Sequence, residues 1–403
     1  MAQSTLARKI TLPLLTFYGL GTILGAGIYL LIGEVTLRAG AHAPIAFILS
    51  SCVAAITAYS FARLSSMYPK SAGEVAYAHA AFNSQFISAL VGLSVVLIGT
   101  VSASTMVNGF AGYFSELVPA SENLIIISLV VFITVFSVWG ISQSMYLAAT
   151  ITIIEILGLV FVVYAVIDLD MMPSITLPTA SSILENNHMI MFAAFISFYA
   201  YIGFEDIVNM AEETKNPTKI VPLAILLSLI FSTLLYVILS ISCTAFIPQS
   251  IFENSRAPLV SIIEHKGYNT TLMSLVSIVA IINGALVQQL MAARVLYGMS
   301  KQNLFFKIFQ KVNSSTRTPI VATVSIAGTI LILSMNFDLV TLAELTSILT
   351  LIVFIVVQCS LILLSIYNQN SRKLDFIIPP AGIMLNTTLI YFGYISPYMN
   401  ETN

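Results

Sequence analysis

The sequence predicts an all-α integral membrane protein, and three observations lead to that class. First, 58% of the 403 residues are hydrophobic and only 8% are charged, with a mean hydropathy of +0.96. These values lie well outside the mixture typical of soluble domains. Second, apolar runs long enough to cross about 30 Å of hydrocarbon recur along the chain. Third, two of these runs are interrupted well inside their length by glycine-rich or polar stretches.

The apolar runs predict about eleven transmembrane helices. They cover residues 11–36, 42–62, 85–113, 124–141, 145–167, 188–211, 220–247, 271–299, 319–336, 339–366 and 375–396. No Pro/Gly/Ser-rich linker divides the chain, so we expect a single transmembrane domain over residues 1–403. With a cytoplasmic N-terminus, 13 of the 16 Lys and Arg residues fall on the cytoplasmic side, as the positive-inside rule expects. We therefore predict a multi-pass protein of the plasma membrane in that orientation.

Several functional classes are excluded by composition. The formal net charge is −2, and no basic tract is present, so we expect no nucleic-acid partner. Cys52, Cys243 and Cys359 share no disulfide or metal-ligand spacing. The four histidines are dispersed, and no HExxH or Ser/His/Asp signature is present. The sequence therefore predicts no enzyme, no catalytic residues, no metal site and no cofactor.

The first interrupted helix contains the stretch GLGTILGAGIY, from Gly19 to Tyr29. Glycine lets the backbone leave helical geometry, and freed N–H and C=O groups are tolerated at membrane depth only where they are buried in protein or line a cavity. The N–H groups of Gly25, Ala26 and Gly27 would begin a half-helix whose positive end suits a carboxylate. The freed carbonyl of Ile23 suits a cation. The alternative is a packing seam of small residues.

The second interrupted helix contains the stretch FYAYIGFED, from Phe198 to Asp206. Packing alone does not require Glu205 and Asp206 so soon after Gly203, because an acid at mid-membrane costs roughly 3 kcal/mol on insertion scales. Each interruption opens a group of five helices, residues 11–167 and 188–366, and leaves an extra helix at 375–396. Paired interrupted helices point to a secondary transporter with a five-plus-five inverted repeat and broken helices 1 and 6.

These motifs resemble those of a known family. The first helix carries GAGIY from Gly25 to Tyr29. The sixth carries FISFYAYIGFED and continues through AEETKNPTKIVP, together spanning residues 195–222. Weaker matches are YPKSAGEVAY at 68–77 and AARVLYGM at 292–299. Together they resemble the amino acid permeases of the amino acid-polyamine-organocation superfamily.

The resemblance implies transport of amino acids by alternating access. It places the substrate carboxylate on the N–H groups of Gly25, Ala26 and Gly27. It places the substrate ammonium on the backbone carbonyls of Ile23, Tyr199 and Ile202. Ala200 and Gly203 complete the predicted substrate-binding residues. Tyr199 lies near the position of an aromatic side chain that closes over the substrate in family members, although an ordinary buried aromatic is the alternative.

A departure from the family occurs in the fifth helix, where Glu155 stands in place of a lysine that many members carry. An unpaired carboxylate at the middle of an apolar span is unfavourable, whereas a protonated carboxyl is much less so. Glu155 is thus a candidate proton carrier or cation ligand, and a neutral interior group with a structural hydrogen bond is the alternative. With Glu205, it forms the predicted coupling set.

The predicted function is secondary active transport of amino acids across the plasma membrane, either proton-coupled (symport) or by exchange (antiport). Two rivals stay open: a polyamine or other amine carrier of the same fold, and a sensor that binds amino acids without transporting them. A polyamine has no carboxylate and would leave the N–H groups of Gly25 to Gly27 unused. The expected partners are an amino acid, protons and the lipid membrane.

Overall fold

The computed structural model describes residues 8–25, 27–69, 73–139, 145–167, 178–253, 255–316, 318–367 and 371–395. Within these residues the chain forms helices and no β-strand, apart from one isolated bridge between Ile10 and Thr214. The prediction of an all-α protein is therefore confirmed.

The helices of the first half follow the predicted spans closely. They are α1 (Leu12–Leu24), α2 (Gly27–Ala39), α3 (Ala43–Met67), α4 (Gly73–Phe82), α5 (Gln85–Ser115), α6 (Glu122–Trp139) and α7 (Met145–Val166). The short 3-10 turn η1 (Gly40–His42) joins α2 to α3. The first predicted span thus contains two helices, α1 and α2, separated by a break. The short helix α4 was not predicted.

The second half repeats the pattern of one broken helix followed by long spans. It comprises α8 (Ala180–Glu185), α9 (Asn187–Phe198), η2 (Tyr199–Tyr201), η3 (Glu205–Glu213), α10 (Pro217–Phe246), η4 (Gln249–Ile251), α11 (Pro258–His265), α12 (Thr271–Lys301), η5 (Lys307–Gln310), α13 (Ile320–Asn336), α14 (Leu339–Tyr367), η6 (Lys373–Phe376), α15 (Ile378–Ile390) and η7 (Tyr391–Ile395). Helix α10 begins before the predicted residue 220 because Pro217 suits the first turn of a helix.

Nine segments of the described chain are long and apolar enough to cross a membrane, and α1 and α13 are shorter apolar helices. One of the nine, Gly27–Met67, joins α2 and α3 and so includes parts of two predicted spans. With α1 and α2 counted as one broken helix, the structure agrees with about eleven crossings. The chain is a multi-pass membrane protein.

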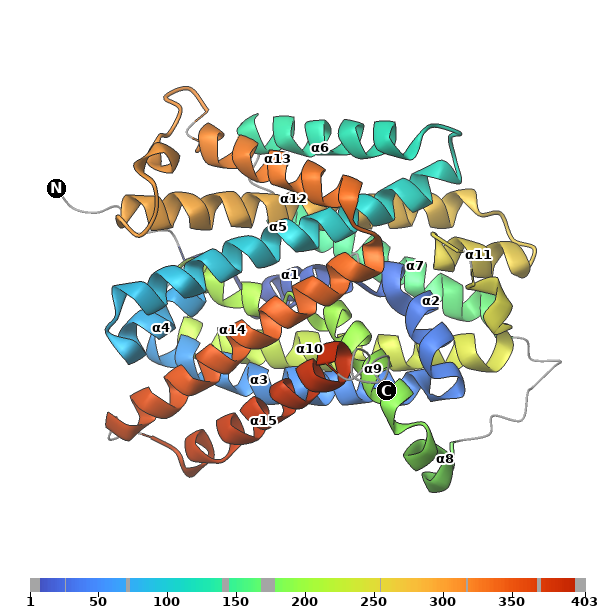
Figure 1. Ribbon diagram of the computed structural model, residues 1–403, viewed down its shortest axis with the longest axis horizontal. Coiled ribbons are helices and arrows are strands. Elements are labelled where there is room, and N and C mark those ends of the chain that lie inside the picture. The colour runs from blue at the N-terminus through green and yellow to red at the C-terminus, as the bar shows by residue number, and fades with distance from the viewer. Residues whose placement is uncertain are drawn as a thin grey trace.

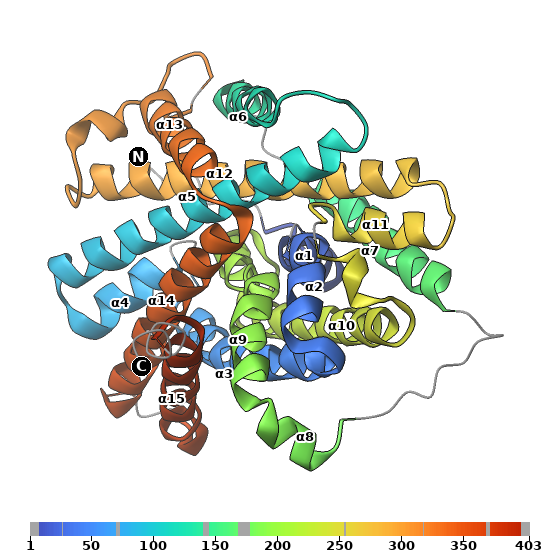
Figure 2. The same ribbon diagram turned by 45° about the vertical axis from the view of Figure 1, so that its right-hand side comes forward.

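The helices are arranged in two groups around a buried centre (Figures 1 and 2). Helices α5 and α12 pack along each other and are covered by α6 and α13, while α3 and α10 pack together on the opposite side. Helices α1, α2 and α9 lie between the groups. In the segment Asn187–Glu213, 89% of the most apolar 18-residue stretch is buried inside the protein. In the segment Lys373–Gly393 the corresponding share is 28%. The broken helices therefore lie at the centre and α15 at the periphery.

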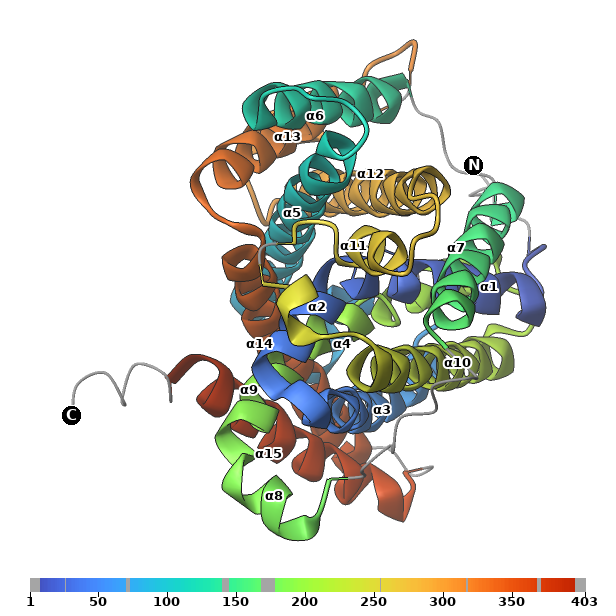
Figure 3. The same ribbon diagram turned by 90° about the vertical axis from the view of Figure 1, so that its right-hand side faces the viewer.

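Helix α7 lies beside the first broken helix (Figure 3). It contacts α1, and also α10, α11 and α12. One stripe of α7 is buried in this position and contains Ala148, Thr152, Glu155, Leu159 and Val162. The spacing of three and four residues is that of a single helix face. This stripe brings Glu155 towards the centre of the molecule.

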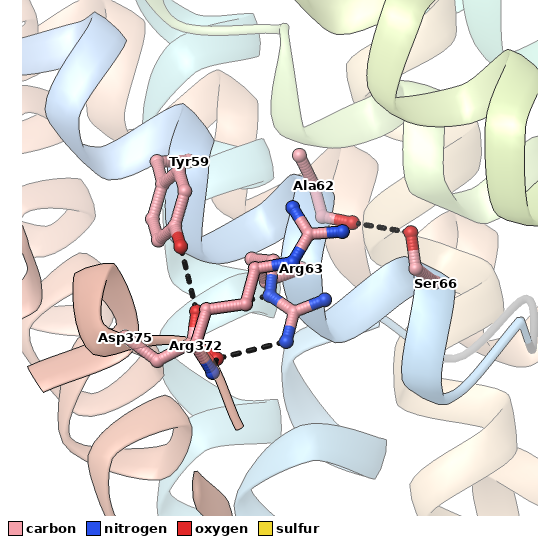
Figure 4. A network of polar contacts seen from close by, with 6 residues as sticks. All are labelled: Tyr59, Ala62, Arg63, Ser66, Arg372 and Asp375. Carbon is pink, nitrogen blue, oxygen red and sulfur yellow. Dashed lines mark hydrogen bonds and ion pairs between the residues drawn. The ribbon is translucent and has the colours of Figure 1, made fainter. Parts of the chain in front are cut away.

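The turn η6, which precedes the peripheral helix α15, is attached to α3 by a buried ion pair (Figure 4). Arg63 of α3 donates from Nε to Asp375 Oδ1 at 2.9 Å and from Nη2 to Oδ2 at 2.8 Å. Tyr59 Oη donates to Oδ1 at 2.6 Å, and the Arg372 N–H donates to Oδ2 at 2.9 Å. The Asp375 side chain is fully buried and that of Arg63 is 14% exposed. Four donors thus satisfy one buried carboxylate, as a buried charge requires.

Candidate substrate-binding site

The first break lies where the glycine-rich motif predicted it. Helix α1 ends at Leu24, the Gly25 N–H donates to the Gly21 carbonyl at 3.1 Å, and α2 begins at Gly27. The predicted site residue Ala26 lies outside the described residues. Because α2 begins here, its first N–H groups have no partner within the helix. The first turn of α2 therefore presents N–H groups and the positive end of the helix dipole at this break.

The second break is longer and follows Phe198, the last residue of α9. A 3-10 turn spans Tyr199–Tyr201, Ile202 is extended, and Gly203 has a φ of +123° before η3 begins at Glu205. This φ is one that side chains rarely adopt, so glycine is required at position 203. The interruption predicted from Phe198 to Asp206 is thus a real departure from α-helical geometry.

The two breaks touch each other. A Cβ added to Gly27 would lie 2.6 Å from the Ala200 Cα, and one added to Gly203 would lie 2.6 Å from the Thr22 carbonyl oxygen. Thr22 Oγ1 also donates to the Gly203 carbonyl at 2.9 Å. Residues about 180 positions apart in the sequence therefore form one backbone-lined centre, in which glycine permits the approach.

Tyr236 of α10 links both breaks and was not predicted from the sequence. Its hydroxyl lies 2.8 Å from the Ile23 carbonyl and 2.9 Å from the Ala200 carbonyl, and its side chain is fully buried. Since a carbonyl oxygen has two lone pairs, Ile23 keeps one for another donor. A tyrosine within a 30-residue apolar helix carries no sequence signal that would have indicated this role.

Tyr199 attaches the second break to α5. Its hydroxyl lies 3.2 Å from Ser102 Oγ and 3.3 Å from the Ser102 carbonyl, and the residue is 3% exposed. The Tyr199 carbonyl accepts the Ile202 N–H at 3.2 Å within the 3-10 turn. The predicted carbonyl at Tyr199 is therefore engaged locally, as the carbonyl of Ile23 is engaged by Tyr236.

Glu205 stabilises the second break by a hydrogen bond to its backbone. Its Oε2 accepts the Gly203 N–H at 2.8 Å, so the carboxyl satisfies a backbone group that the break leaves free. Asp206 follows and is 5% exposed, with Oδ2 lacking a hydrogen-bond partner among the described residues. Glu74 of α4 lies close enough to Asp206 to interact electrostatically, and burial raises the pKa of Glu74 to about 7. The sequence did not single out Glu74.

Glu155 lies opposite the first break. Its side chain is fully buried, and neither carboxyl oxygen has a hydrogen-bond partner among the described residues. Tyr29 Oη donates to the Glu155 backbone carbonyl at 2.7 Å. One turn earlier on α7, Thr152 Oγ1 donates to the Phe17 carbonyl at 3.1 Å. Helix α7 thus contacts Phe17, before the break, through Thr152, and Tyr29, after the break, one turn later. Glu155 therefore lies beside the stretch of chain that includes the break.

A small cavity with both polar and apolar lining residues lies between α1, α5, α7 and α12, on the side of the first break towards the N-terminus. It is lined by Tyr18, Gly21, Thr22, Met106, Ala148, Thr152, Asn283, Gly284, Val287 and Gln288. Water-sized molecules can place their centres in about 20 Å³ of this cavity. The Gln288 Oε1 atom is buried and has no partner in the described part of the chain.

The structure thus brings Ile23, Gly25 and Gly27 together with the segment Tyr199–Gly203, and Glu205 belongs to the same centre. Glu155 approaches it from α7. Such an arrangement offers backbone N–H groups, backbone carbonyls and buried carboxyls around two facing helix ends. It defines a membrane protein with a central site between two broken helices, which is the architecture of secondary transporters.

Comparison with known proteins assigns the family. The family model described as "Amino acid permease" matches residues 10–403, so the chain belongs to the amino acid permease family. The resemblance to the amino acid-polyamine-organocation superfamily is thereby confirmed.

Individual relatives are more distant. The chain is 26% identical to cationic amino acid transporter 3, mitochondrial, of Arabidopsis thaliana, over 95% of this chain and 65% of that protein. It is 27% identical to a branched-chain amino acid permease of Bacillus subtilis (strain 168), over 90% of this chain and 82% of the relative. A methylthioribose transporter of the same bacterium is 26% identical, over 98% and 90%. The chain spans 61% to 66% of the length of the first three Arabidopsis relatives.

Proposed function

We propose that this protein is a secondary transporter that moves an amino acid across the membrane by alternating access. The observation that carries the proposal is the contact between the two breaks, where Gly27 meets Ala200 and Gly203 meets Thr22. A backbone-lined centre of this kind addresses the α-carboxylate and α-ammonium of a substrate, which all amino acids share. The names of the relatives, which include cationic and branched-chain amino acid transporters, support this substrate class.

The proposed site uses the N–H groups of Ala26 and Gly27 for the carboxylate. The Gly25 N–H, predicted as a third donor, already donates to the Gly21 carbonyl at 3.1 Å. The ammonium is received by the carbonyls of Ile23, Tyr199 and Ile202. Because the Ile23 and Tyr199 carbonyls each already accept a hydrogen bond, we propose that the substrate uses their remaining lone pairs. Binding therefore requires both the amine and the carboxylate.

The proposed organisation is that of two inverted repeats, residues 11–167 and 188–366, followed by an extra helix. We propose a plasma-membrane protein with its N-terminus in the cytoplasm, supported by the bias of Lys and Arg residues. Relatives named mitochondrial and vacuolar make localisation by fluorescence microscopy a necessary check.

The test is counterflow in proteoliposomes containing the purified protein, with a panel of labelled amino acids and polyamines. We expect saturable exchange of at least one L-amino acid and none of its decarboxylated analogue. Equal uptake of the decarboxylated analogue would favour the amine carrier. Saturable binding of an amino acid without any counterflow would favour a sensor.

Coupling is the second part of the proposal, with Glu155 as the proton carrier and Glu205 as a secondary candidate. A carboxyl titrates during transport if its access to water alternates between states. Glu155→Gln imitates the protonated acid, so we expect it to keep counterflow and to lose uptake driven by a pH gradient. The matched control is Glu344→Gln in α14, near a helix end, which should keep both. Unchanged gradient-driven uptake in Glu155→Gln would remove this residue from the mechanism.

A further inference from the structure

The cavity between α1, α5, α7 and α12 is large enough for water and has polar side chains in its lining. A cavity that offers about 10–15 Å³ to the centre of a water molecule can hold one, provided that polar partners line it. Here the available volume is about 20 Å³. The Gln288 Oε1 atom is buried in the lining without a partner among the described residues, and an unsatisfied buried acceptor is costly. Water in the cavity would supply the missing donor.

The cavity ends one helical turn from Glu155. Ala148 and Thr152 line it and share their buried stripe with Glu155, and residues three or four apart on a helix have Cβ atoms about 5–6 Å from each other. Side chains on an α-helix lean towards its N-terminus. At position 155 this direction is that of the turn that contains Thr152, which lines the cavity.

No counter-charge competes for Glu155 within the described residues. The titratable groups that interact with it electrostatically are Tyr29 of α2 and Tyr236 of α10. On the cavity side, Tyr18 of α1 lines the wall, with Asp206 and Arg294 near Tyr18. No Lys or Arg forms an ion pair with Glu155 in this part of the chain. Both carboxyl oxygens are thus available to a proton delivered from the cavity.

We propose that this cavity is the proton path to Glu155, with water held by Gln288 and Thr152 between the carboxyl and the N-terminal side of the membrane. The inference rests on the proposed coupling role of Glu155. In the step itself, the Glu155 carboxyl exchanges its proton with water in the cavity, which carries the proton as hydronium to or from the N-terminal side. In the other state of the transport cycle Glu155 exchanges its proton with the opposite side, so one proton crosses the membrane per cycle. The cargo uses the breaks, and the proton uses the cavity.

The first test uses variants that fill the cavity or remove a polar group from its lining. Ala148→Leu places a larger apolar side chain in the cavity, and its matched control, Ala149→Leu, adds the same group on a partly exposed neighbour. Gln288→Met removes the orphan acceptor with little change of size. We expect Ala148→Leu and Gln288→Met to reduce uptake driven by a pH gradient by about tenfold, which corresponds to about 1.4 kcal/mol on the rate of proton delivery. Counterflow should persist, because exchange moves no net proton.

Two results of the functional test would overturn the proposal. One is gradient-driven uptake in Ala148→Leu equal to that of Ala149→Leu. The other is loss of counterflow together with gradient-driven uptake in both Ala148→Leu and Gln288→Met, which would assign the cavity to the cargo.

The second test measures water access without relying on transport. Val287→Cys is introduced after replacement of Cys52, Cys243 and Cys359 by serine or alanine, and a membrane-impermeant thiosulfonate is applied to either face. We expect labelling from the N-terminal side only. Absence of labelling from that side overturns the hydrated path. If wild-type protein shows no gradient-driven uptake while labelling occurs, the coupling role of Glu155 fails but the hydrated cavity stands.

Discussion

The two breaks in the helices are stabilised in different ways. At the first break, two helices end and begin within three residues, and glycine backbone makes the contact. The second break extends from Tyr199 to Phe204, and side chains support it: Tyr199 on α5, Tyr201 on the Phe47 carbonyl of α3, and Glu205 on its own backbone. The first break is thus held by close backbone contacts and by one side chain, Tyr236 on the Ile23 carbonyl, while several side chains fix the second to the surrounding helices.

The largest effect is expected where glycine makes the closest backbone contact. Gly27→Val would place side-chain atoms against the Ala200 backbone, 2.6 Å from its Cα, which cannot yield as a flexible side chain could. The helix ends must separate, and a displacement of this kind costs about 100-fold in function. We expect amino acid binding, measured by scintillation proximity, to be lost. Gly328→Val, where nothing lies within 4 Å, is the matched control. Normal binding in Gly27→Val would mean that the first break is a packing seam.

A smaller effect is expected at the second break, where conformation and contact combine. Gly203→Ala introduces a Cβ at a φ of +123° and 2.6 Å from the Thr22 carbonyl. The strain of such a conformation is about 1–3 kcal/mol, and the contact adds to it. Gly267→Ala, at a φ of +75° with open space around it, isolates the conformational part. We expect the initial rate of counterflow to fall in Gly203→Ala and to stay near wild type in Gly267→Ala. Equal rates in both would show that the contact between the breaks is dispensable.

The tyrosine hydroxyls allow a finer comparison. Tyr236→Phe removes the hydroxyl shared by the carbonyls of both breaks, whereas Tyr201→Phe removes a bond from the second break alone. A neutral hydrogen bond contributes about 1 kcal/mol, which is about a fivefold change in affinity. We expect weaker substrate binding in Tyr236→Phe than in Tyr201→Phe by roughly that factor, measured by isothermal titration. A larger loss in Tyr201→Phe would reverse the assignment of the two hydroxyls.

The smallest change in transport is expected at Glu74, which lies near Asp206 beyond the second break. Its pKa of about 7 exceeds the ordinary value of 4.5, because burial disfavours the carboxylate. The stability that depends on this group is therefore fully present below pH 4.5 and is lost as the pH rises through 7. Glu74→Gln should reduce the fall in melting temperature between pH 5 and pH 8, as measured by differential scanning fluorimetry. Glu116→Gln, at an exposed position, should leave the fall unchanged. An identical pH profile in Glu74→Gln would contradict the assignment.

The sequence was informative wherever a local pattern reflects a physical requirement. Apolar runs located the crossing helices, and Gly25, Gly27 and Gly203 located the breaks, since backbone can leave a membrane helix only with such residues. The residues that complete the centre were not predictable in this way. Tyr236 and Thr22 act through contacts with segments about 180 to 213 positions away. The hydrated cavity depends on four helices, and α4, α8 and α11 are too short to produce an apolar span.

The ion pair between α3 and η6, the turn that precedes α15, affects the order in which the protein can assemble. Arg63 and Asp375 are 312 residues apart, so the ribosome delivers the carboxylate only after almost every other helix has been synthesised. Until then, the guanidinium in the second crossing lacks the partner that satisfies it in the finished protein, and an unpaired charge at that position resists burial. The Arg63 side chain of α3 is therefore paired only after η6 and α15 have packed against α3, which is a late step of assembly in the membrane. A chain that ends before residue 371 would lack Asp375 and leave the Arg63 guanidinium without this partner.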